Sequence, residues 1–358
     1  MVGIRAPGEA ALLDVELADL GPGRFHVQTL FSGVSAGTEL TFLKGSNPAL
    51  HASWDAEYGV FRADTPAAAY PVERLGYMEV GRVVDSRAHE VAEGTVVAMT
   101  YGHKEAHVAD AAGERHVALP ADLDPLLGIF VAHMGPICAN GLLHAAAELT
   151  RGDVRRLGDG VENLRVVVHG AGTVGLLTAL LALHHGAAEV AVVDRTPARL
   201  AAAAALGCWA VDEADGAAWE QLKASWRHGA GQRGADVAFQ CRGQDAALAE
   251  ALRCLRPQGT VVDLAFYPGG APDLRLGEEF HHNGLGIRCA QIGRVPRGLA
   301  HAWDRERLSR ETLGLLERRG DDVRAHLVSD VVPFADGPAL LHDVTARRRQ
   351  VIQAVLAC

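Results

Sequence analysis

With 358 residues, the chain is longer than the roughly 100 to 200 residues of one typical domain, which predicts two domains. Hydrophobic residues make up 49% of it and charged residues 22%, a composition typical of globular proteins that excludes a disordered or membrane-embedded chain. The formal net charge of −10 argues against a nucleic-acid partner, because such surfaces gather Lys and Arg. The first residues lack the pattern of a secretory signal, and no apolar run approaches the ~20 residues that span a membrane. We therefore expect a cytoplasmic protein without a membrane partner.

Short β segments broken by Gly, Pro and Asp occupy the chain up to about residue 138. Examples are RFHVQTLFSGVSAG from Arg24, GRVVDS from Gly81 and TVVAMTYG from Thr95. This pattern predicts an antiparallel or barrel-like β domain.

From Leu164 the pattern changes to alternating strands and helices: RVVVHG, LLTALLALHHG, EVAVVD and PARLAAAAALG, followed by strand candidates ADVAFQC, GTVVDLAF and GIRCAQIG. Such a series predicts a doubly wound parallel sheet in an α/β protein. After Arg318 short strands return in LVSDVVPF and QVIQAVLAC, on either side of a helix. The predicted domains are therefore residues 1–137 completed by 319–358, and residues 138–318.

A glycine motif, GAGTVG, directly follows the apolar strand RVVVH. A G-x-G-x-x-G motif between a strand and a helix is typical of a dinucleotide-binding turn. Gly170 allows the tight turn, Gly172 lets the backbone approach the pyrophosphate, and Gly175 permits close packing of helix on strand. Thr173 and Val174 begin the helix, whose N-terminal amides favour a phosphate. These residues are predicted to bind the cofactor.

The next strand ends at Asp194, nineteen residues after Gly175. A carboxylate there can accept hydrogen bonds from the ribose hydroxyls of NAD and repels the 2′-phosphate of NADP. Arg195 and Arg199 follow and are also assigned to the cofactor site, because arginine can pair with that phosphate. We expect NAD as the cofactor, with NADP as the less favoured alternative.

Several segments occur together in the order and spacing of one superfamily: FSGVSAGTEL, LGYMEVGRVV, VVVHGAGTVGLL, GADVAFQCRG, ALRCLRPQGTVVDLAF and QVIQAVLAC. By these segments the chain resembles the medium-chain dehydrogenases/reductases. The resemblance implies a GroES-like β-rich catalytic domain, completed by the C-terminal segment, and a Rossmann domain for the dinucleotide. It also implies that Ala265, Phe266 and Gln291 lie along the nicotinamide ring, with backbone groups of Ala265 and Gln291 binding its carboxamide.

The zinc-containing alcohol dehydrogenases of this superfamily carry three ligands for a catalytic zinc. The resemblance aligns them with Ala36, Tyr77 and Met134, and none of these is a sound ligand for Zn²⁺. The family's relay histidine aligns with Thr41. The six cysteines show no C-x-x-C spacing, and none lies between residues 97 and 120, where a structural zinc would be held. We therefore expect no metal.

Without zinc, a positioned donor must stabilise the charge that develops on the substrate oxygen. Thr38 aligns with the relay hydroxyl and Tyr77 with a lost ligand, although a strand threonine bonded to its own backbone and a packing tyrosine are structural alternatives. His133 suits acid–base chemistry near neutral pH, although a surface or core histidine is the more common case. Glu39 and Glu79 flank the same loops and could hold these donors or a substrate hydroxyl, although we expect both carboxylates to face solvent.

Two further stretches are weaker candidates for a functional site. His281 and His282 resemble a metal-binding pair, but neighbouring side chains of an extended segment point in opposite directions, so we interpret them as the polar start of a strand. Arg294 and Arg297 can recognise an anionic substrate group, although a solvated loop arginine is the commoner case.

The sequence thus predicts a zinc-independent oxidoreductase that transfers a hydride between the cofactor and a secondary alcohol or ketone of a small metabolite. The wording S-A-G-T-E, with Gly-Tyr in place of Gly-His, is similar to a zinc-free branch that includes bacteriochlorophyllide dehydrogenase-like proteins and dehydrogenases of secondary metabolism. A quinone or enoyl reductase and a catalytically inactive dinucleotide sensor remain alternatives. We expect a homodimer.

Overall fold

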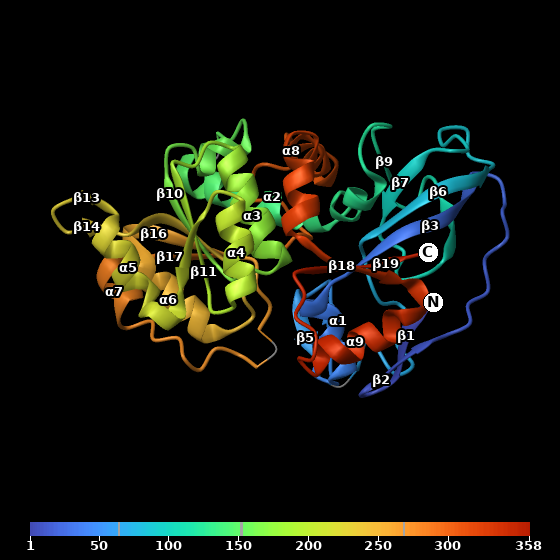
Figure 1. Ribbon diagram of the computed structural model, residues 1–358, viewed down its shortest axis with the longest axis horizontal. Helices are drawn as coiled ribbons and strands as arrows, with labels where there is room; N and C mark the ends of the chain where they lie inside the picture. The colour runs from blue at the N-terminus through green and yellow to red at the C-terminus, as the bar shows by residue number, and fades with distance from the viewer. Residues whose placement is uncertain (64, 151–152, 268) are drawn as a thin grey trace. The chain divides into compact units, whose positions relative to one another are not determined.

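The computed structural model describes residues 1–63, 65–150, 153–267 and 269–358, and Figure 1 shows their helices and strands. The chain divides into two compact units. Unit 1 comprises residues Met1–His133 and Val328–Cys358, and unit 2 comprises Met134–Leu327. The sequence-based domain bounds near residues 138 and 319 stay a prediction about independently folding domains. In the structure, the helical segment Arg305–His326 extends past residue 319 but is kinked at Arg319, whose backbone is not helical (φ −128°, ψ 19°).

Unit 1 is built around a β sheet. Its strands are β1 (Val2–Ala6), β2 (Glu9–Leu12), β3 (Arg24–Val34), β4 (Ser53–Asp55), β5 (Val60–Arg62), β6 (Glu79–Ser86), β7 (Val96–Met99), β8 (Ala106–Asp110), β9 (Val117–Ala118), β18 (Val328–Pro333) and β19 (Gln353–Ala357). Its α-helices are α1 (Ala36–Leu43) and α9 (Gly337–Thr345), and its 3₁₀ turns are η1 (Pro48–Leu50), η2 (Pro125–Phe130) and η5 (Phe334–Asp336). Among the described residues the main sheet runs β18-β19-β3-β6-β7-β9, with β8 also paired to β3.

The long strand β3 shows why these residues form a sheet. Phe25 and Val27 are fully buried, whereas Gln28 between the buried positions is exposed, which is the period-two pattern of a strand with one face on a core. The C-terminal strand β19 pairs antiparallel with β3, Ala354 lying opposite Val34. Residues far apart in the chain therefore share one sheet and one core.

Unit 2 is a parallel sheet with helices. Its strands are β10 (Arg165–His169), β11 (Glu189–Asp194), β12 (Trp209–Asp212), β15 (Ala235–Gln240), β16 (Leu255–Asp263) and β17 (Gly286–Cys289), with a small hairpin of β13 (Arg227–Gly229) and β14 (Gln232–Arg233). Its α-helices are α2 (Met134–Thr150), α3 (Thr173–His184), α4 (Pro197–Ala205), α5 (Ala218–Ser225), α6 (Asp245–Cys254), α7 (Glu279–Asn283) and α8 (Arg305–His326), and its 3₁₀ turns are η3 (Leu157–Gly160) and η4 (Glu213–Asp215).

The order of the sheet in unit 2 positions the site. Six described strands run β12-β11-β10-β15-β16-β17, and every adjacent pair is parallel. The strand order reverses between β10 and β15, and ligands of such sheets bind at the carboxyl ends of the strands at this reversal. The strand residues 166–168 and 191–193 are fully buried, as expected for a sheet covered on both faces. The predicted α/β class, with a β-rich domain and a Rossmann sheet, is confirmed.

Three local expectations are wrong. The segment from Ala36 begins helix α1, so Thr38 lies in a helix and not in a strand. His281 and His282 lie within helix α7 and not in an extended segment. Glu39 and Glu79 are 2% and 0% exposed, because a buried histidine lies between their carboxylates.

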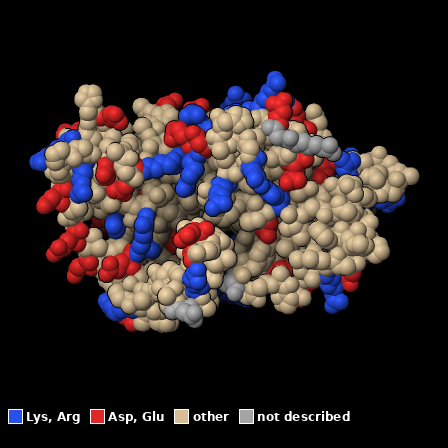
Figure 2. Space-filling view, turned by 180° about the vertical axis from the view of Figure 1, so that it is seen from behind, with Lys and Arg blue, Asp and Glu red and all other residues tan. Residues whose placement is uncertain are grey.

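Charge on the surface is mixed. On the face drawn in Figure 2, acidic and basic side chains are interspersed. Among the described residues, no helix combines the length and hydropathy needed to cross a bilayer.

Candidate functional site

The glycine turn after β10 has the backbone that its motif predicts. Gly170 has φ +98°, a left-handed conformation that favours glycine. A Cβ at Gly175 would lie 1.7 Å from the carbonyl oxygen of Gly170, so the helix packs too closely on the turn for any side chain. A Cβ at Gly172 would meet nothing within 4 Å, so the turn leaves open space beside this residue.

Helix α3 begins at this open space. Its N-cap is Gly172, which has no side chain to accept hydrogen bonds from the first turn. Thr173 and Val174 form the partly exposed start of the helix. The amide N–H groups and the positive end of the helix dipole make this end favourable for an anion.

Asp194 ties the glycine turn to the next strand. Its Oδ2 accepts a hydrogen bond from the amide of Ala171 at 2.8 Å. Its Oδ1 accepts from the amides of Arg195 at 2.8 Å and Thr196 at 2.9 Å. The side chain is 4% exposed. Asp194 therefore anchors backbone on two loops, a role that spacing alone did not predict.

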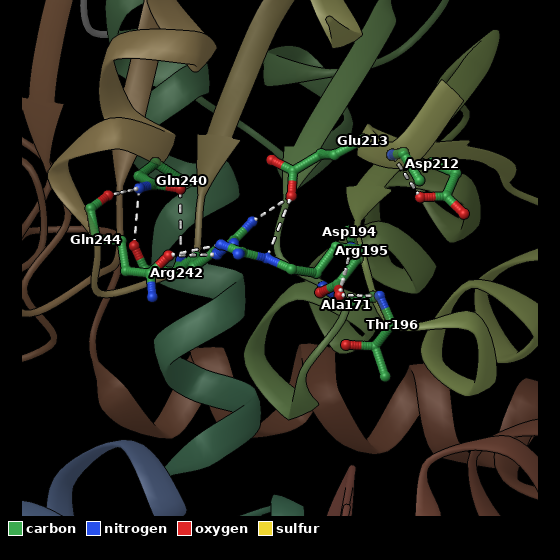
Figure 3. A network of polar contacts seen from close by, with 10 residues as sticks. Ala171, Asp194, Arg195, Thr196, Asp212, Glu213, Gln240, Arg242 and Gln244 are labelled. Carbon is green, nitrogen blue, oxygen red and sulfur yellow. Dashed lines mark hydrogen bonds and ion pairs between the residues drawn. The ribbon is translucent and has the colours of Figure 1, made fainter. Parts of the chain in front are cut away.

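A polar network of arginines and acceptors lies beside Asp194 (Figure 3). Glu213 Oε2 lies 2.8 Å from Arg242 Nη1 and 3.7 Å from Arg195 Nε. The side-chain oxygen of Gln244 accepts from Arg242 Nε at 2.9 Å and from Arg195 Nη2 at 3.2 Å. Burial raises the pKa of Glu213, against the lowering effect of Arg195. Two guanidinium groups thus share two acceptors.

The remaining predicted cofactor residues follow later strands of unit 2. Ala265 donates its amide to Asp263 Oδ1 at 3.0 Å, and Phe266 is 49% exposed. The loop around Gln291 is held by the buried Asn140, whose Nδ2 donates to the carbonyl of Gln291 at 3.4 Å. Arg199 lies partly exposed in α4.

In unit 1 the structure brings Tyr77 and His133 together. Their rings meet edge to face with centroids 4.6 Å apart. The hydroxyl of Tyr77 also forms a short hydrogen bond with the hydroxyl of Ser35. Thr38 instead lies on the exposed surface of α1, where its carbonyl accepts from Thr41 Oγ1 at 2.5 Å. A tyrosine with a hydroxyl and an imidazole at hand can donate a proton to a developing anion.

A buried cluster of ionisable groups lies behind Ser35. His103, 0% exposed, has its Nε2 3.0 Å from Glu39 Oε2 and its Nδ1 3.8 Å from Glu79 Oε1. Ser32 Oγ bonds His103 Nδ1 at 2.6 Å and donates to Glu79 Oε1 at 3.0 Å. Glu39 Oε1 also accepts from the amide of Ser35 at 2.8 Å. The cluster therefore fixes the residue that bonds Tyr77.

Burial and pairing shift the pKa values of this cluster. Burial raises the pKa of Glu79 to about 7, against the lowering effect of His103. Burial lowers the pKa of His103, but the Glu39 carboxylate outweighs it, so the pKa of His103 is raised. The carboxyl of Glu79, which tends to keep its proton, thus lies beside the paired imidazole of His103 and carboxylate of Glu39.

The residues at the three inferred zinc positions do not fit a zinc ion. Ala36 has no donor atom, Tyr77 offers a phenol bonded to Ser35, and Met134 is a buried thioether. Within residues 1–63, 65–150, 153–267 and 269–358, no group of three or more His, Cys, Asp or Glu is arranged to hold a metal ion.

Sequence reasoning missed several residues that organise these sites. Ser32 and Ser35 lie within the segment FSGVSAGTEL but were assigned no role, and His103 belongs to no motif. Their partners come from distant segments. Glu213 and Arg242 follow two different strands and meet because parallel strands end at the same edge of the sheet. The signal for the second pair was available, since both follow predicted strands of one Rossmann sheet.

The fold and the glycine turn together indicate the class of protein. Unit 2 is a Rossmann domain with a glycine turn of the dinucleotide-binding type, and unit 1 is rich in β structure. Zinc-binding dehydrogenases are the family whose model matches residues 173–299. D-guloside 3-dehydrogenase of Escherichia coli K12 is 26% identical over 345 residues, covering 93% of this chain and 92% of that protein.

Solved structures share the whole fold. Galactitol-1-phosphate dehydrogenase of Escherichia coli superposes with a TM-score of 0.75 at 17% identity, covering 100% of this chain and 99% of that one. A protein of Sinorhizobium meliloti 1021, described as a zinc-binding dehydrogenase and solved with NADP, gives 0.74 at 18% identity, covering 100% and 98%. The chain is thus similar over nearly its whole length to one dehydrogenase and has the same fold as others, and the family model itself matches residues 173–299.

Proposed function

We propose that this protein is an NAD-linked dehydrogenase that interconverts a secondary alcohol and a ketone of a small metabolite without zinc. The observation that carries the proposal is the turn at Gly170 to Gly172, which Asp194 anchors through the amide of Ala171 and which leaves open space beside Gly172. An open, backbone-lined turn at the start of a helix suits a pyrophosphate.

Different residues of unit 2 would bind different parts of the cofactor. The amides at the start of α3, beginning with Thr173 and Val174, would hold the pyrophosphate, and Asp194 would face the adenosine ribose. Backbone groups at Ala265 and Gln291 would hold the carboxamide. When bound, the nicotinamide supplies or accepts the hydride.

In the proposed chemistry, Tyr77 donates to the substrate oxygen as negative charge develops there. The hydroxyl of Ser35 bonds the tyrosine hydroxyl and can relay a proton to it, while the imidazole of His133 packs against the tyrosine ring. Support for a zinc-free site comes from the three side chains at the inferred ligand positions. A tyrosine in place of a histidine keeps a polar donor and removes a metal ligand.

The substrate class is proposed from chemistry and from one relative. A name such as D-guloside 3-dehydrogenase denotes oxidation of a ring hydroxyl of a sugar derivative, which is a secondary alcohol. We therefore propose a polyhydroxylated or glycosidic secondary alcohol as the first class to test.

The test combines binding, metal content and turnover. The purified protein should bind NAD, contain no stoichiometric zinc, and reduce NAD at 340 nm with a member of a glycoside and polyol panel. Tyr77→Phe should lower kcat by about 10² to 10³ while the Kd for NAD stays within twofold, since a donor to the transition state matters little in the binary complex. Tyr58→Phe, on an exposed hairpin, is the matched control.

The other outcomes identify the rivals. One tightly bound zinc per chain would overturn the zinc-free assignment. Reduction of 2-enones without alcohol oxidation would indicate an enoyl or quinone reductase. Tight NAD binding without turnover on either panel would indicate a sensor.

A further inference from the structure

The network beside Asp194 raises the question of what its two arginines do. Arg195 directly follows the strand that ends where a dinucleotide places its adenosine ribose. Arg242 follows β15, and its Cβ would lie 3.0 Å from a Cβ added at Gly170, so it is packed against the cofactor turn itself. An arginine at this location ordinarily favours NADP, because its guanidinium pairs with the 2′-phosphate. Two of them would form a phosphate clamp.

Glu213 contacts both guanidinium groups, as the dashed lines in Figure 3 show. One carboxylate oxygen, Oε2, contacts both: Arg242 Nη1 at 2.8 Å and Arg195 Nε at 3.7 Å. A carboxylate and a phosphate present the same kind of acceptor to an arginine. The Glu213 carboxylate therefore already makes, with both arginines, the kind of contact that a phosphate oxygen makes with arginine.

Asp194 is poorly placed to be the sole residue that discriminates NAD from NADP. Its two oxygens already accept three backbone amides, and its side chain is 4% exposed. Glu213 is 28% exposed and Arg195 is 63% exposed, so these two groups meet the solvent through which a 2′-phosphate arrives.

We propose that Glu213 acts as an internal substitute for the 2′-phosphate of NADP, neutralising Arg195 and Arg242 and so setting the preference for NAD. The proposal rests on the proposed function, because it concerns the adenosine end of the same cofactor site. A bound 2′-phosphate would bring between about −1.5 and −2 charges into the network. With Glu213 present it must displace or confront a carboxylate, whereas without that charge it meets two unpaired guanidinium groups.

The test measures binding on the full chain and not turnover. Isothermal titration calorimetry gives the Kd values of NAD, NADP, 5′-AMP and adenosine 2′,5′-bisphosphate for the wild type and for Glu213→Gln. Glutamine keeps the shape and an acceptor oxygen but loses the charge. We expect NADP and the bisphosphate to bind at least about tenfold more tightly to Glu213→Gln, with NAD and 5′-AMP within about threefold.

Asp212→Asn is the matched control. It removes the same charge from the adjacent residue, and asparagine keeps the side-chain oxygen that accepts from the amide of Ala214. Its ratio of Kd values should change by less than threefold. Adding Arg195→Gln to Glu213→Gln should abolish the gain for NADP, and this surface substitution leaves the core unchanged. If Glu213→Gln fails to fold, as judged by circular dichroism, Glu213→Ala replaces it with the same expectation.

Each outcome has a distinct meaning. A wild type that binds NADP as tightly as NAD, or a Glu213→Gln protein with an unchanged ratio, overturns this inference and leaves the proposed function in place. A wild type that binds neither dinucleotide overturns the proposed function itself.

Discussion

The glycine turn of unit 2 and the buried cluster of unit 1 are both polar, but they are built in opposite ways. In the turn, one side chain, Asp194, accepts hydrogen bonds from three backbone amides. In the cluster, side chains from segments 32, 39, 79 and 103 bond one another. The turn depends on backbone geometry that a motif encodes, whereas the cluster depends on residues that meet only in the fold. Four substitutions test this contrast, in order of expected effect.

The largest effect is expected at Gly175. Gly175→Ala would place a Cβ 1.7 Å from the carbonyl oxygen of Gly170, and two packed backbone segments cannot separate cheaply. We expect a loss of about 4 kcal/mol or more in the free energy of unfolding, together with loss of NAD binding, measured by calorimetry. Gly172→Ala is the control: its φ is −84° and its surroundings are open, so stability should hold while NAD binding weakens. Equal stability of both variants would show that the turn is not packed as described.

The second effect is expected in the cluster. His103→Leu leaves the buried carboxyls of Glu39 and Glu79 without their shared partner, and breaking a buried pair costs about 3–5 kcal/mol. Denaturant midpoints measure it. The exposed His89→Leu should change stability by no more than about 0.5 kcal/mol. A His103→Leu protein as stable as the wild type would mean that the cluster is dispensable.

The third effect is the dependence of stability on pH, which separates the contribution of charge in the cluster from that of packing. Glu79 has its pKa raised from 4.5 to about 7, so the folded state holds a proton that the unfolded state releases between these values. Its stabilising contribution is complete below pH 4.5 and is lost as pH rises toward 7, by about 3 kcal/mol. The raised pKa of His103 acts in the same direction.

Glu79→Gln should remove the larger part of this slope, as denaturant midpoints between pH 4.5 and 8 would show. Glu114→Gln, on a partly exposed pair with His107, should keep it. A wild-type stability that increases over this range would contradict the assignment of the proton to Glu79.

The smallest effect is expected at Asp194. Asp194→Ala removes an acceptor of three amides and should loosen the turn, weakening both NAD and NADP by about 2 kcal/mol in binding free energy. Titration calorimetry measures both, with the exposed Asp215→Ala as control. An Asp194→Ala protein that gains NADP affinity would instead assign the discrimination to repulsion by Asp194.

The fold was predictable where local pattern decides it. The sequence predicted the features that depend on a few neighbouring residues. These are buried runs such as residues 166–168, the glycine turn, and the acidic end of the strand at Asp194. Helix α1 was missed because RFHVQTLFSGVSAG was interpreted as a β segment up to Gly37, whereas the residues from Ala36 form a helix.

The cluster was not predictable for a physical reason. A glutamate is ordinarily exposed, and burial is tolerated here because His103 lies between Glu39 and Glu79. Residue 103 is 64 positions from Glu39, and the sequence around neither residue predicts that the two pair. Gly76 gives the space, since a Cβ there would lie 2.6 Å from the imidazole of His103.

The pairing of β19 with β3 has a consequence for biosynthesis. Gln353 donates its side-chain amide to the carbonyl of Val34, 319 positions earlier. On the ribosome, residues 31–34 of β3 must wait for β19 until all of unit 2 has been translated, and this part of the strand edge is open to mispairing meanwhile. Contacts this distant in sequence also slow folding, because a long loop must close before they form. A chaperone that shields an open sheet edge would therefore act on this chain early, and would be needed until the Rossmann unit and the last strand have emerged.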